Sequence, residues 1–436
     1  MAMMEDRYGL SVSTQSAAAH DAYLHAVDNL LCAGPDLCAG FEKAVLLDPG
    51  FALAEIALGR CHAIYGRGAE ARAVAERAVD KVSGASRREV QHVNALTLLL
   101  HGQSAAALTA IQQHVAEFPR DALVLQPALG AFGLIGFSGR LDRERELLMF
   151  MDSLSPHYGD DWWFNSVYAF AEVDCDRDSD RMARAEKRAE KSLQQMPHNA
   201  NAAHTRAHVY YELEQHETGA AFLHRWLATH DQPMLLRGHL AWHVALLELA
   251  RGNGHAAWAT YDREIAPLLT RLGAPTPPLN VLTDTASFLW RAELSGESQR
   301  DADWVALSDF CVQRFARVGL PYADFHVAMV HARAGRNDAA EALHKALVQW
   351  AGDAPDLLVR AVVTGVASAM DAYAREDWPR AADVLETLHD QFVRLGGSRA
   401  QIDIVRRTQI AACRRAGREA RAQALAFERP HTISAA

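Results

Sequence analysis

Apolar residues recur at helical spacing along almost the whole chain. In DSDRMARAEKRAEKSLQQMP, residues 178–197, the charged residues point mostly to water, and one face is formed by Met182, Ala185, Ala189 and Leu193. Acidic residues open this run and Pro197 lies near its end, which predicts a surface helix packed on a neighbour through small residues. Comparable runs alternate with short breakers such as QQMPHNAN and LARGNG, a pattern typical of antiparallel helical hairpins. No segment has the pattern of a strand, so the predicted fold class is all-α.

A repeat period is visible near the N-terminus. The segment AGFEKAVLLDP places Phe41, Ala44 and Pro49 in the order that closes a tetratricopeptide unit, and Leu58 follows Leu24 by 34 residues. Small residues let the two helices of a hairpin approach closely, and proline ends the second helix because it cannot continue the hydrogen-bond ladder. Two successive units therefore fit residues 18–51 and 52–85.

These patterns predict an α-solenoid of tetratricopeptide-like helical hairpins, wound as a right-handed superhelix. We expect one continuous solenoid with three sections. The first holds N-terminal tetratricopeptide-like units, the second holds helical hairpins with a histidine-rich inner face, and the third holds further hairpins and a closing cap. The predicted sections are residues 1–125, 126–350 and 351–436.

Composition narrows the choice of partners. The 436 residues are 50% hydrophobic and 22% charged, as in ordinary globular proteins, and the formal net charge is −10. That balance gives no overall attraction for phosphate backbones or anionic lipid, so neither nucleic acid nor a membrane is expected as a partner. The six cysteines form no C-x-x-C pair, and MAMMEDRYGL lacks the pattern of a signal peptide. We expect a cytoplasmic protein, and the sequence is compatible with a monomer and with a homodimer.

A row of polar side chains marks the segment HTRAHVYYELEQH. His204, His208, Glu212 and His216 follow one another at four-residue intervals. Each four-residue step turns a helix about 40° beyond a full turn, so the ends of the row are splayed by about 120° and no single ion meets all four. Neighbouring members of the row do converge, and a metal ion would then need further ligands from another helix.

A second pair at the same spacing supplies such ligands. In GHLAWHVALLEL, His239 and His243 flank Trp242 on the expected first helix of the next hairpin. First helices of consecutive solenoid units lie side by side, so the two rows are predicted to face one another. The candidate ligands of a divalent metal are His204, His208 and His243. The alternative is that these histidines only pack in the interior with hydrogen-bond partners.

Several catalytic signatures are absent from the sequence. The chain has no G-x-x-x-x-G-K-[ST] phosphate loop, no G-x-G-x-x-G after a strand and no G-x-S-x-G elbow. His216-Glu217 begins like a zinc-protease motif, but Ala220 stands where the second histidine ligand belongs. The glycines of LGAFGLIGFSG are predicted to allow close packing of helices.

Several blocks in a fixed order resemble the tetratricopeptide repeat protein 38 family, in its bacterial branch, over essentially the whole chain. The most specific are GDDWWFNSVYAFAEVD, HTRAHVYYEL, GHLAWHVALLELARGNGHAAWATYDREI, LTDTASFLWRAELSG, YADFHVAMVHARAG and LGGSRAQIDIV. The last block departs from the family at Arg399 and Ile402. The resemblance implies the architecture and points to a region, but it implies no reaction. The matching polar positions are Glu172, His204, His208, Glu212, His239, Trp242, His243, Tyr261, Asp262, Asp284, Trp290, Arg291 and His326.

Three functions are compatible with these residues. The first is a binding module whose concave pocket holds a small polar or anionic ligand or a peptide end, with Arg291 contacting the anion. The second is an enzyme in which Glu212 acts as base and Arg291 stabilises negative charge, while His204, His208 and His243 hold a metal or move protons. The third is a scaffold for partner proteins. The expected ligand-binding residues are His204, His208, Glu212, His239, Trp242, His243, Asp284, Arg291 and His326.

Overall fold

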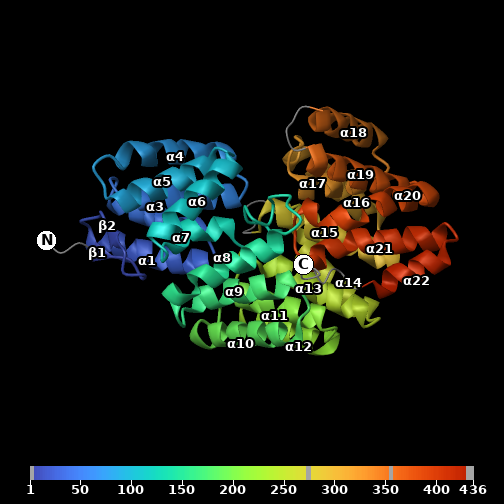
Figure 1. Ribbon diagram of the computed structural model, residues 1–436, viewed down its shortest axis with the longest axis horizontal. Coiled ribbons are helices and arrows are strands. Elements are labelled where there is room, and N and C mark those ends of the chain that lie inside the picture. The colour runs from blue at the N-terminus through green and yellow to red at the C-terminus, as the bar shows by residue number, and fades with distance from the viewer. Residues whose placement is uncertain (1–3, 272–275, 353–356, 429–436) are drawn as a thin grey trace.

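Helices make up nearly all of the regular structure (Figure 1). The computed structural model describes residues 4–271, 276–352 and 357–428. The prediction of an all-α fold is confirmed, with one small departure. Two-residue strands β1 (Met4–Glu5) and β2 (Ser11–Val12) pair in antiparallel fashion, although no strand was predicted. The Arg88 guanidinium donates to the Ser11 carbonyl at 2.9 Å and holds this terminal segment against the helices.

Residues 18–51 and 52–85, predicted as two repeat units, contain one helix pair each. The helices of a pair pack against each other, and α3 also packs against α5 of the following pair. The N-terminal elements are α1 (Ala17–Leu31), α2 (Leu37–Leu47), α3 (Ala52–Ile64), α4 (Gly68–Lys81), α5 (Arg87–Leu100), α6 (Ser104–Glu117), α7 (Ala122–Leu125) and the 3-10 helix η1 (Gln126–Ala128).

The glycine-rich segment after η1 differs from its prediction. It forms turns over residues 130–138 and no helix, so its glycines do not pack one helix on another. Gly130 and Gly139 adopt φ angles of 77° and 71°, in the left-handed region that favours glycine. A run of such residues ends the helical pattern and leaves an irregular loop.

The middle of the chain continues the succession of helix pairs. In α10, only the face that carries Met182, Ala185 and Ala189 is buried, as its amphipathic pattern predicts. The elements are α8 (Arg143–Tyr158), α9 (Trp162–Cys175), α10 (Ser179–Gln195), α11 (Ala200–Glu212), α12 (His216–Thr229), α13 (Arg237–Ala250), α14 (Gly254–Thr260), the π-helical turn η2 (Tyr261–Ile265) and the 3-10 helix η3 (Ala266–Leu269).

The C-terminal part adds four more helix pairs. In Figure 1 these helices lie at the opposite end of the molecule from α1–α7, with α9–α14 below and between them. The elements are α15 (Pro278–Leu294), α16 (Asp301–Arg314), α17 (Pro321–Arg333), α18 (Asn337–Gly352), α19 (Leu357–Ala374), α20 (Trp378–Leu388), the 3-10 helix η4 (His389–Leu395), α21 (Arg399–Arg415) and α22 (Glu419–Phe427).

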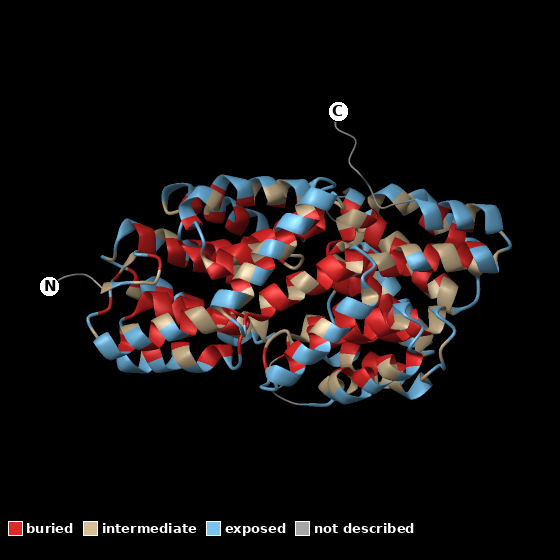
Figure 2. Cartoon of the chain, turned by 90° about the horizontal axis from the view of Figure 1, so that it is seen from below, coloured by how far each residue is buried: buried red, intermediate tan, exposed pale blue. Residues whose placement is uncertain are grey.

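Alternate helices form an inner layer. Helices α9, α11, α13, α15, α17 and α19 pack each on the next, and their even-numbered partners pack outside them. Buried residues lie mainly in the interior and exposed residues on the outer helices (Figure 2). In α13 and α15 nearly every position is buried, so polar side chains on these helices have to find partners inside the protein.

The C-terminal helix α21 does more than close one end of the array. It packs against α15 and α11 in the middle of the chain as well as against α19 and α20. The Trp290 indole donates to the Thr408 hydroxyl at 2.9 Å, and the Arg399 amide donates to the Asp174 carboxylate at 3.1 Å. The inner layer is therefore covered by α21 at this point. None of the described helices has the length and apolar character needed to cross a membrane.

Candidate functional site

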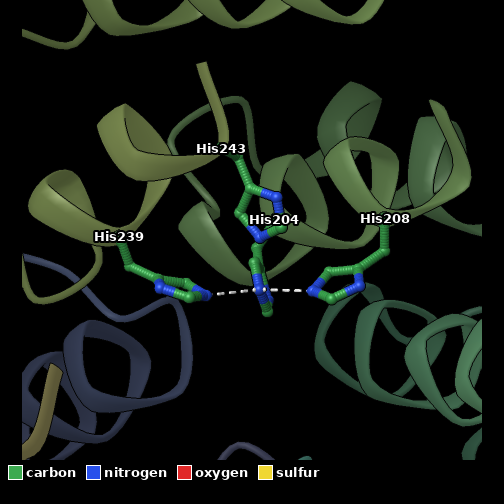
Figure 3. A group of neighbouring side chains, drawn as sticks. All are labelled: His204, His208, His239 and His243. Atoms are coloured by element: carbon green, nitrogen blue, oxygen red, sulfur yellow. Dashed lines mark hydrogen bonds between the residues drawn. The ribbon is translucent and has the colours of Figure 1, made fainter. Parts of the chain in front are cut away.

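Four histidine side chains meet between α11 and α13, which are neighbours in the inner layer (Figure 3). His204 and His208 are one turn apart on α11, and His239 and His243 are one turn apart on α13. His204 Nε2 lies 2.9 Å from His208 Nε2 and 3.0 Å from His239 Nε2. Each of the four offers a ring nitrogen, and these atoms all lie within 4.8 Å of one another. We call these residues the four-histidine cluster.

Aromatic rings fix the planes of two imidazoles. Phe170 of α9 stacks on His204 with ring centroids 5.4 Å apart, and Trp242 stacks on His239 at 5.0 Å. Both contacts are nearly parallel, with interplanar angles of 18° and 14°. Rings held between apolar surfaces keep their orientation and exclude water, so the nitrogens point at one another before anything binds.

The hydrogen bonds inside the cluster are not mutually satisfiable. A neutral imidazole nitrogen carries either one hydrogen or one lone pair in the ring plane. His204 Nε2 therefore makes a full hydrogen bond with only one of its two imidazole neighbours. On the far side, His239 Nδ1 lies 2.9 Å and 3.0 Å from the two carboxylate oxygens of Asp284. Donation to that carboxylate leaves a lone pair on His239 Nε2, facing the centre of the cluster.

Among the described residues, His243 lacks hydrogen-bond partners at both ring nitrogens, and both are buried. Such atoms cost roughly 1–3 kcal/mol each when nothing compensates them. Burial, reinforced by neighbouring imidazoles, holds the pKa of His204, His208 and His243 well below the usual value of 6.5. These three rings are therefore neutral at physiological pH, with lone pairs available to a metal ion.

The spacing of the nitrogens fits a transition metal. Imidazole nitrogens bind zinc at about 2.0–2.1 Å, which places pairs of ligand atoms roughly 3.3 Å apart in a tetrahedral site. The two hydrogen-bonded distances, 2.9 and 3.0 Å, need only a few tenths of an ångström of adjustment, and the other pairs of ligand atoms lie within 4.8 Å of one another. Four neutral nitrogen donors suit zinc, copper, nickel, cobalt or iron, whereas magnesium and calcium prefer oxygen.

A cavity of about 520 Å³ adjoins the cluster. His204 and His239 line it, whereas His208 and His243 do not. Much of the wall is apolar, and the glycine-rich loop supplies Phe132 and Phe137. Its volume lies in the range of sites that hold small organic molecules. Two imidazoles of the cluster thus face a space where a ligand fits.

Other predicted site residues lie elsewhere. The Glu212 carboxylate accepts from Arg177 Nε at 2.7 Å and lies 3.3 Å from Arg399 Nη2. Two guanidinium groups thus hold this carboxylate outside the four-histidine cluster, and the role of Glu212 as a base stays a prediction. His216, at the start of α12, is outside the four-histidine cluster. Contrary to expectation, the four members of the row do not share one helix, because α11 ends at Glu212 and His216 begins α12.

Arg291 does not line the cavity. Its Nη2 donates to the Ala400 carbonyl at 2.5 Å, its Nε donates to Ser287 Oγ at 3.1 Å, and its Nη1 lies 3.4 Å from the Asp403 carboxylate. Its donors are directed to α15 and α21 and not to the cavity, and the anion contact expected for Arg291 stays a prediction. His326 also stays apart, with Nδ1 bonded to the Tyr322 carbonyl at 2.7 Å, and burial lowers its pKa to about 3.

The remaining matched positions are mostly structural. Asp284 and Trp242 support His239, as described above, and Trp290 ties α15 to α21. Glu172 accepts from Arg184 and Arg188 of α10 at 3.3 and 3.1 Å. Tyr261 stacks on Phe288 at 4.8 Å, and Asp262 pairs with Arg300.

A second histidine cluster, in the N-terminal part, has a different character. The Asp121 carboxylate oxygen Oδ2 lies 3.0 Å from His92 Nδ1 and 3.0 Å from His114 Nε2. The same oxygen accepts from Arg88 Nε at 2.8 Å. A guanidinium there brings a positive charge and already uses the oxygen lone pair, so a cation does not fit. This group is a buried ion-pair network that joins α5, α6 and the start of α7.

Sequence reasoning missed Arg60, which lines the cavity from α3. The only signal for it is a basic residue interrupting the apolar run FALAEIALGRCHAI. Without the fold, such a residue is indistinguishable from the solvent-facing arginines of an amphipathic helix. The loop that brings Phe132 and Phe137 to the cavity was missed for a related reason, because its glycines were assigned to helix packing. No protein-family model matches this chain.

Proposed function

We propose that this protein binds a transition-metal ion at the four-histidine cluster and a small organic ligand in the adjoining cavity. The observation that carries the proposal is the convergence of four imidazoles, three of them buried and His204 half-buried, beside a cavity that two of them line. We further propose a cytoplasmic member of the tetratricopeptide repeat protein 38 family with the architecture of a right-handed α-solenoid. The successive packing of alternate helices from α9 to α19 supports that architecture.

Three features favour a metal over simple packing of histidines. His204 Nε2 cannot satisfy both of its imidazole neighbours, and both ring nitrogens of His243 lack partners. Asp284 accepts from the outer nitrogen of His239, in the arrangement by which carboxylates orient metal-binding histidines. A divalent ion would satisfy His204 Nε2 and one of the two His243 nitrogens together, because one lone pair from each of the four rings then points at one centre.

Elemental analysis of tag-free protein tests the metal. We expect about one transition-metal ion per chain after purification, or after removal of metal with a chelator and reconstitution with Zn²⁺. Reconstitution with Co²⁺ should give the intense visible absorption of a tetrahedral nitrogen site. Protein that carries no metal and takes up neither ion would rule the proposal out.

Asp284→Asn is expected to weaken the metal site without destroying it. Loss of the anionic acceptor lowers the basicity of His239 and frees its ring to take the other tautomer, which typically costs 10–100-fold in metal affinity. Competition with a chromophoric chelator measures the change. Asp324→Asn is the matched control, since Asp324 is also buried on an inner-layer helix but lies outside the cluster. Equal effects of the two variants would contradict the proposed role of Asp284.

Metal-assisted catalysis on the bound ligand is the second candidate. It is favoured by the position of His204 and His239 on the cavity wall, since a metal held there would lie beside the ligand. In this candidate the metal polarises the substrate, and Glu212 takes no part. We expect turnover that disappears with chelation and returns with the metal. A panel of hydrolytic and redox substrates without any metal-dependent turnover would leave binding as the function.

A scaffold function receives less support. It requires an open groove with few buried polar groups, whereas α21 covers part of the inner layer and α13 and α15 carry many buried polar side chains.

A further inference from the structure

We infer that the cavity binds an organic monocarboxylate with an apolar body, and that Arg60 pairs with its carboxylate. The inference depends on the proposed function only in that it places a ligand in the cavity. It does not depend on the metal.

The Arg60 guanidinium has no anionic partner in the described structure. Its Nε is buried and makes no hydrogen bond, and its Nη2 reaches only the neutral Gln126 Oε1, at 3.5 Å. The buried arginines of the protein core differ in this respect: Arg88 pairs with Asp121, and Arg291 pairs with Asp403. An unpaired guanidinium inside a protein is destabilising, so a counter-ion is expected to arrive from outside the chain.

The charged side chains of the cavity wall favour an anionic ligand. Of the residues that line the cavity, Arg60 and Arg314 are the charged ones, and His204 and His239 are the titratable ones. Among the residues that the structure describes, none of those that line the cavity is an aspartate, glutamate or lysine. A low-dielectric space with cationic groups and no carboxylate attracts anions and repels cations. Burial also lowers the pKa of the Arg60 guanidinium, an effect that a bound anion would reverse.

The lining away from Arg60 describes the rest of the ligand. Aromatic and aliphatic side chains dominate it, including Leu30, Ile64, Phe132, Phe137, Trp163 and Phe170. Such a wall binds a hydrocarbon or aromatic body, while a planar guanidinium matches a carboxylate through two parallel hydrogen bonds. Arg314 is exposed to solvent, so Arg60 is the guanidinium of this lining that is shielded from water, and it balances one negative charge, whereas a phosphate monoester carries nearly two. The chemistry therefore favours a carboxylic acid with a single charge.

Calorimetric titration with four alkyl probes tests the ligand class. Octanoate is the predicted ligand type, octanol has the same body without charge, octylamine carries the opposite charge, and octyl phosphate carries more negative charge. We expect octanoate to bind at least tenfold more tightly than each of the others. Octanol binding as tightly as octanoate would overturn the inference, and so would tighter binding of octyl phosphate or no binding of octanoate.

Variants of Arg60 test the residue. Arg60→Gln is expected to lower octanoate affinity at least tenfold and to leave octanol affinity and metal content unchanged. Arg60→Lys should restore part of the octanoate affinity, because it returns the charge without the two-pronged geometry. Arg225→Gln, an exposed arginine on the outer helix α12, is the control and should have no effect. Unchanged octanoate affinity in Arg60→Gln would overturn the inference.

A stability measurement separates a ligand-binding arginine from a structural one. If Arg60 is held for a ligand, Arg60→Met should raise the melting temperature of the ligand-free protein, since it removes an unpaired buried charge. A lower melting temperature would mark Arg60 as structural and overturn the inference. The proposed metal site is tested separately, because metal content is expected to be the same in every Arg60 variant. Absence of metal with retained octanoate selectivity would refute the metal site and leave the inference standing.

Discussion

Replacing both His204 and His208 by alanine is expected to abolish transition-metal binding and the stability that the metal confers. The double variant removes two of the four convergent nitrogens, including His204, which lies between His208 and His239 (Figure 3). Two remaining imidazoles cannot hold a divalent ion against water with comparable affinity. A metal at 100 to 1,000 times its dissociation constant stabilises a folded protein by about 3–4 kcal/mol, and this increment should vanish.

Urea unfolding in the presence of Zn²⁺ and of a chelator measures the increment directly. The alanines also leave a void, so the variant will be less stable under both conditions, and only the difference between the two conditions is informative. His326→Ala is the matched control, because His326 is buried on the inner layer outside the cluster. It should retain the full increment. A double variant that keeps the increment would show that zinc binds elsewhere.

Asp121→Ala is expected to destabilise the protein by about 3–5 kcal/mol without changing its metal content. The substitution leaves the buried Arg88 guanidinium with only the Asp6 carboxylate, at 3.2 Å, and removes the shared acceptor of His92 and His114. Breaking a buried ion pair on one side costs this much because a desolvated charge loses its partner. Urea unfolding at neutral pH measures the loss, and elemental analysis shows that the two histidine clusters differ in function.

Asp80→Ala is the control for that measurement, since Asp80 is exposed on α4 and should cost less than about 0.5 kcal/mol. The contribution of Asp121 also has a definite pH dependence. Its histidine and arginine neighbours outweigh burial and hold the pKa of its carboxyl well below 3.8. The unfolded chain therefore takes up a proton first, so this stability is present above about pH 4 and is lost as the pH falls further. Similar losses in both variants would contradict the assigned role.

Much of the fold was predictable because helices are encoded locally. The amphipathic run 178–197 predicted α10 and the orientation of its small residues, and the 34-residue period placed α1 to α4 in two pairs. The predictions failed where contacts between distant segments, and not the local sequence pattern, determine the structure. The glycine-rich segment forms a loop whose glycines at 130 and 139 have positive φ, and α21 packs back on the middle of the chain.

The candidate site was predictable only in part. Four-residue spacing places His204 beside His208, and His239 beside His243, on any helix. The sequence contains no comparable information about Glu212 and Arg291, whose side chains turn to Arg177, Arg399 and Asp403. Long polar side chains can reach partners several ångströms from their own helix, and these partners belong to segments far away in the chain.

The sequence by itself determined that the chain is all-helical, that its helices come in pairs, and that two pairs of histidines each share a helix face. Periodicity suffices for these features because backbone geometry within a helix does not depend on what the helix contacts. The solenoid pattern also predicted that the two histidine pairs face one another, as α11 and α13 do. The tertiary structure alone decided how closely the four ring nitrogens approach, and that Arg60, far away in sequence, lines the cavity beside them. Those decisions depend on how whole helices pack, because contacts between distant segments leave no periodic signal in a single sequence.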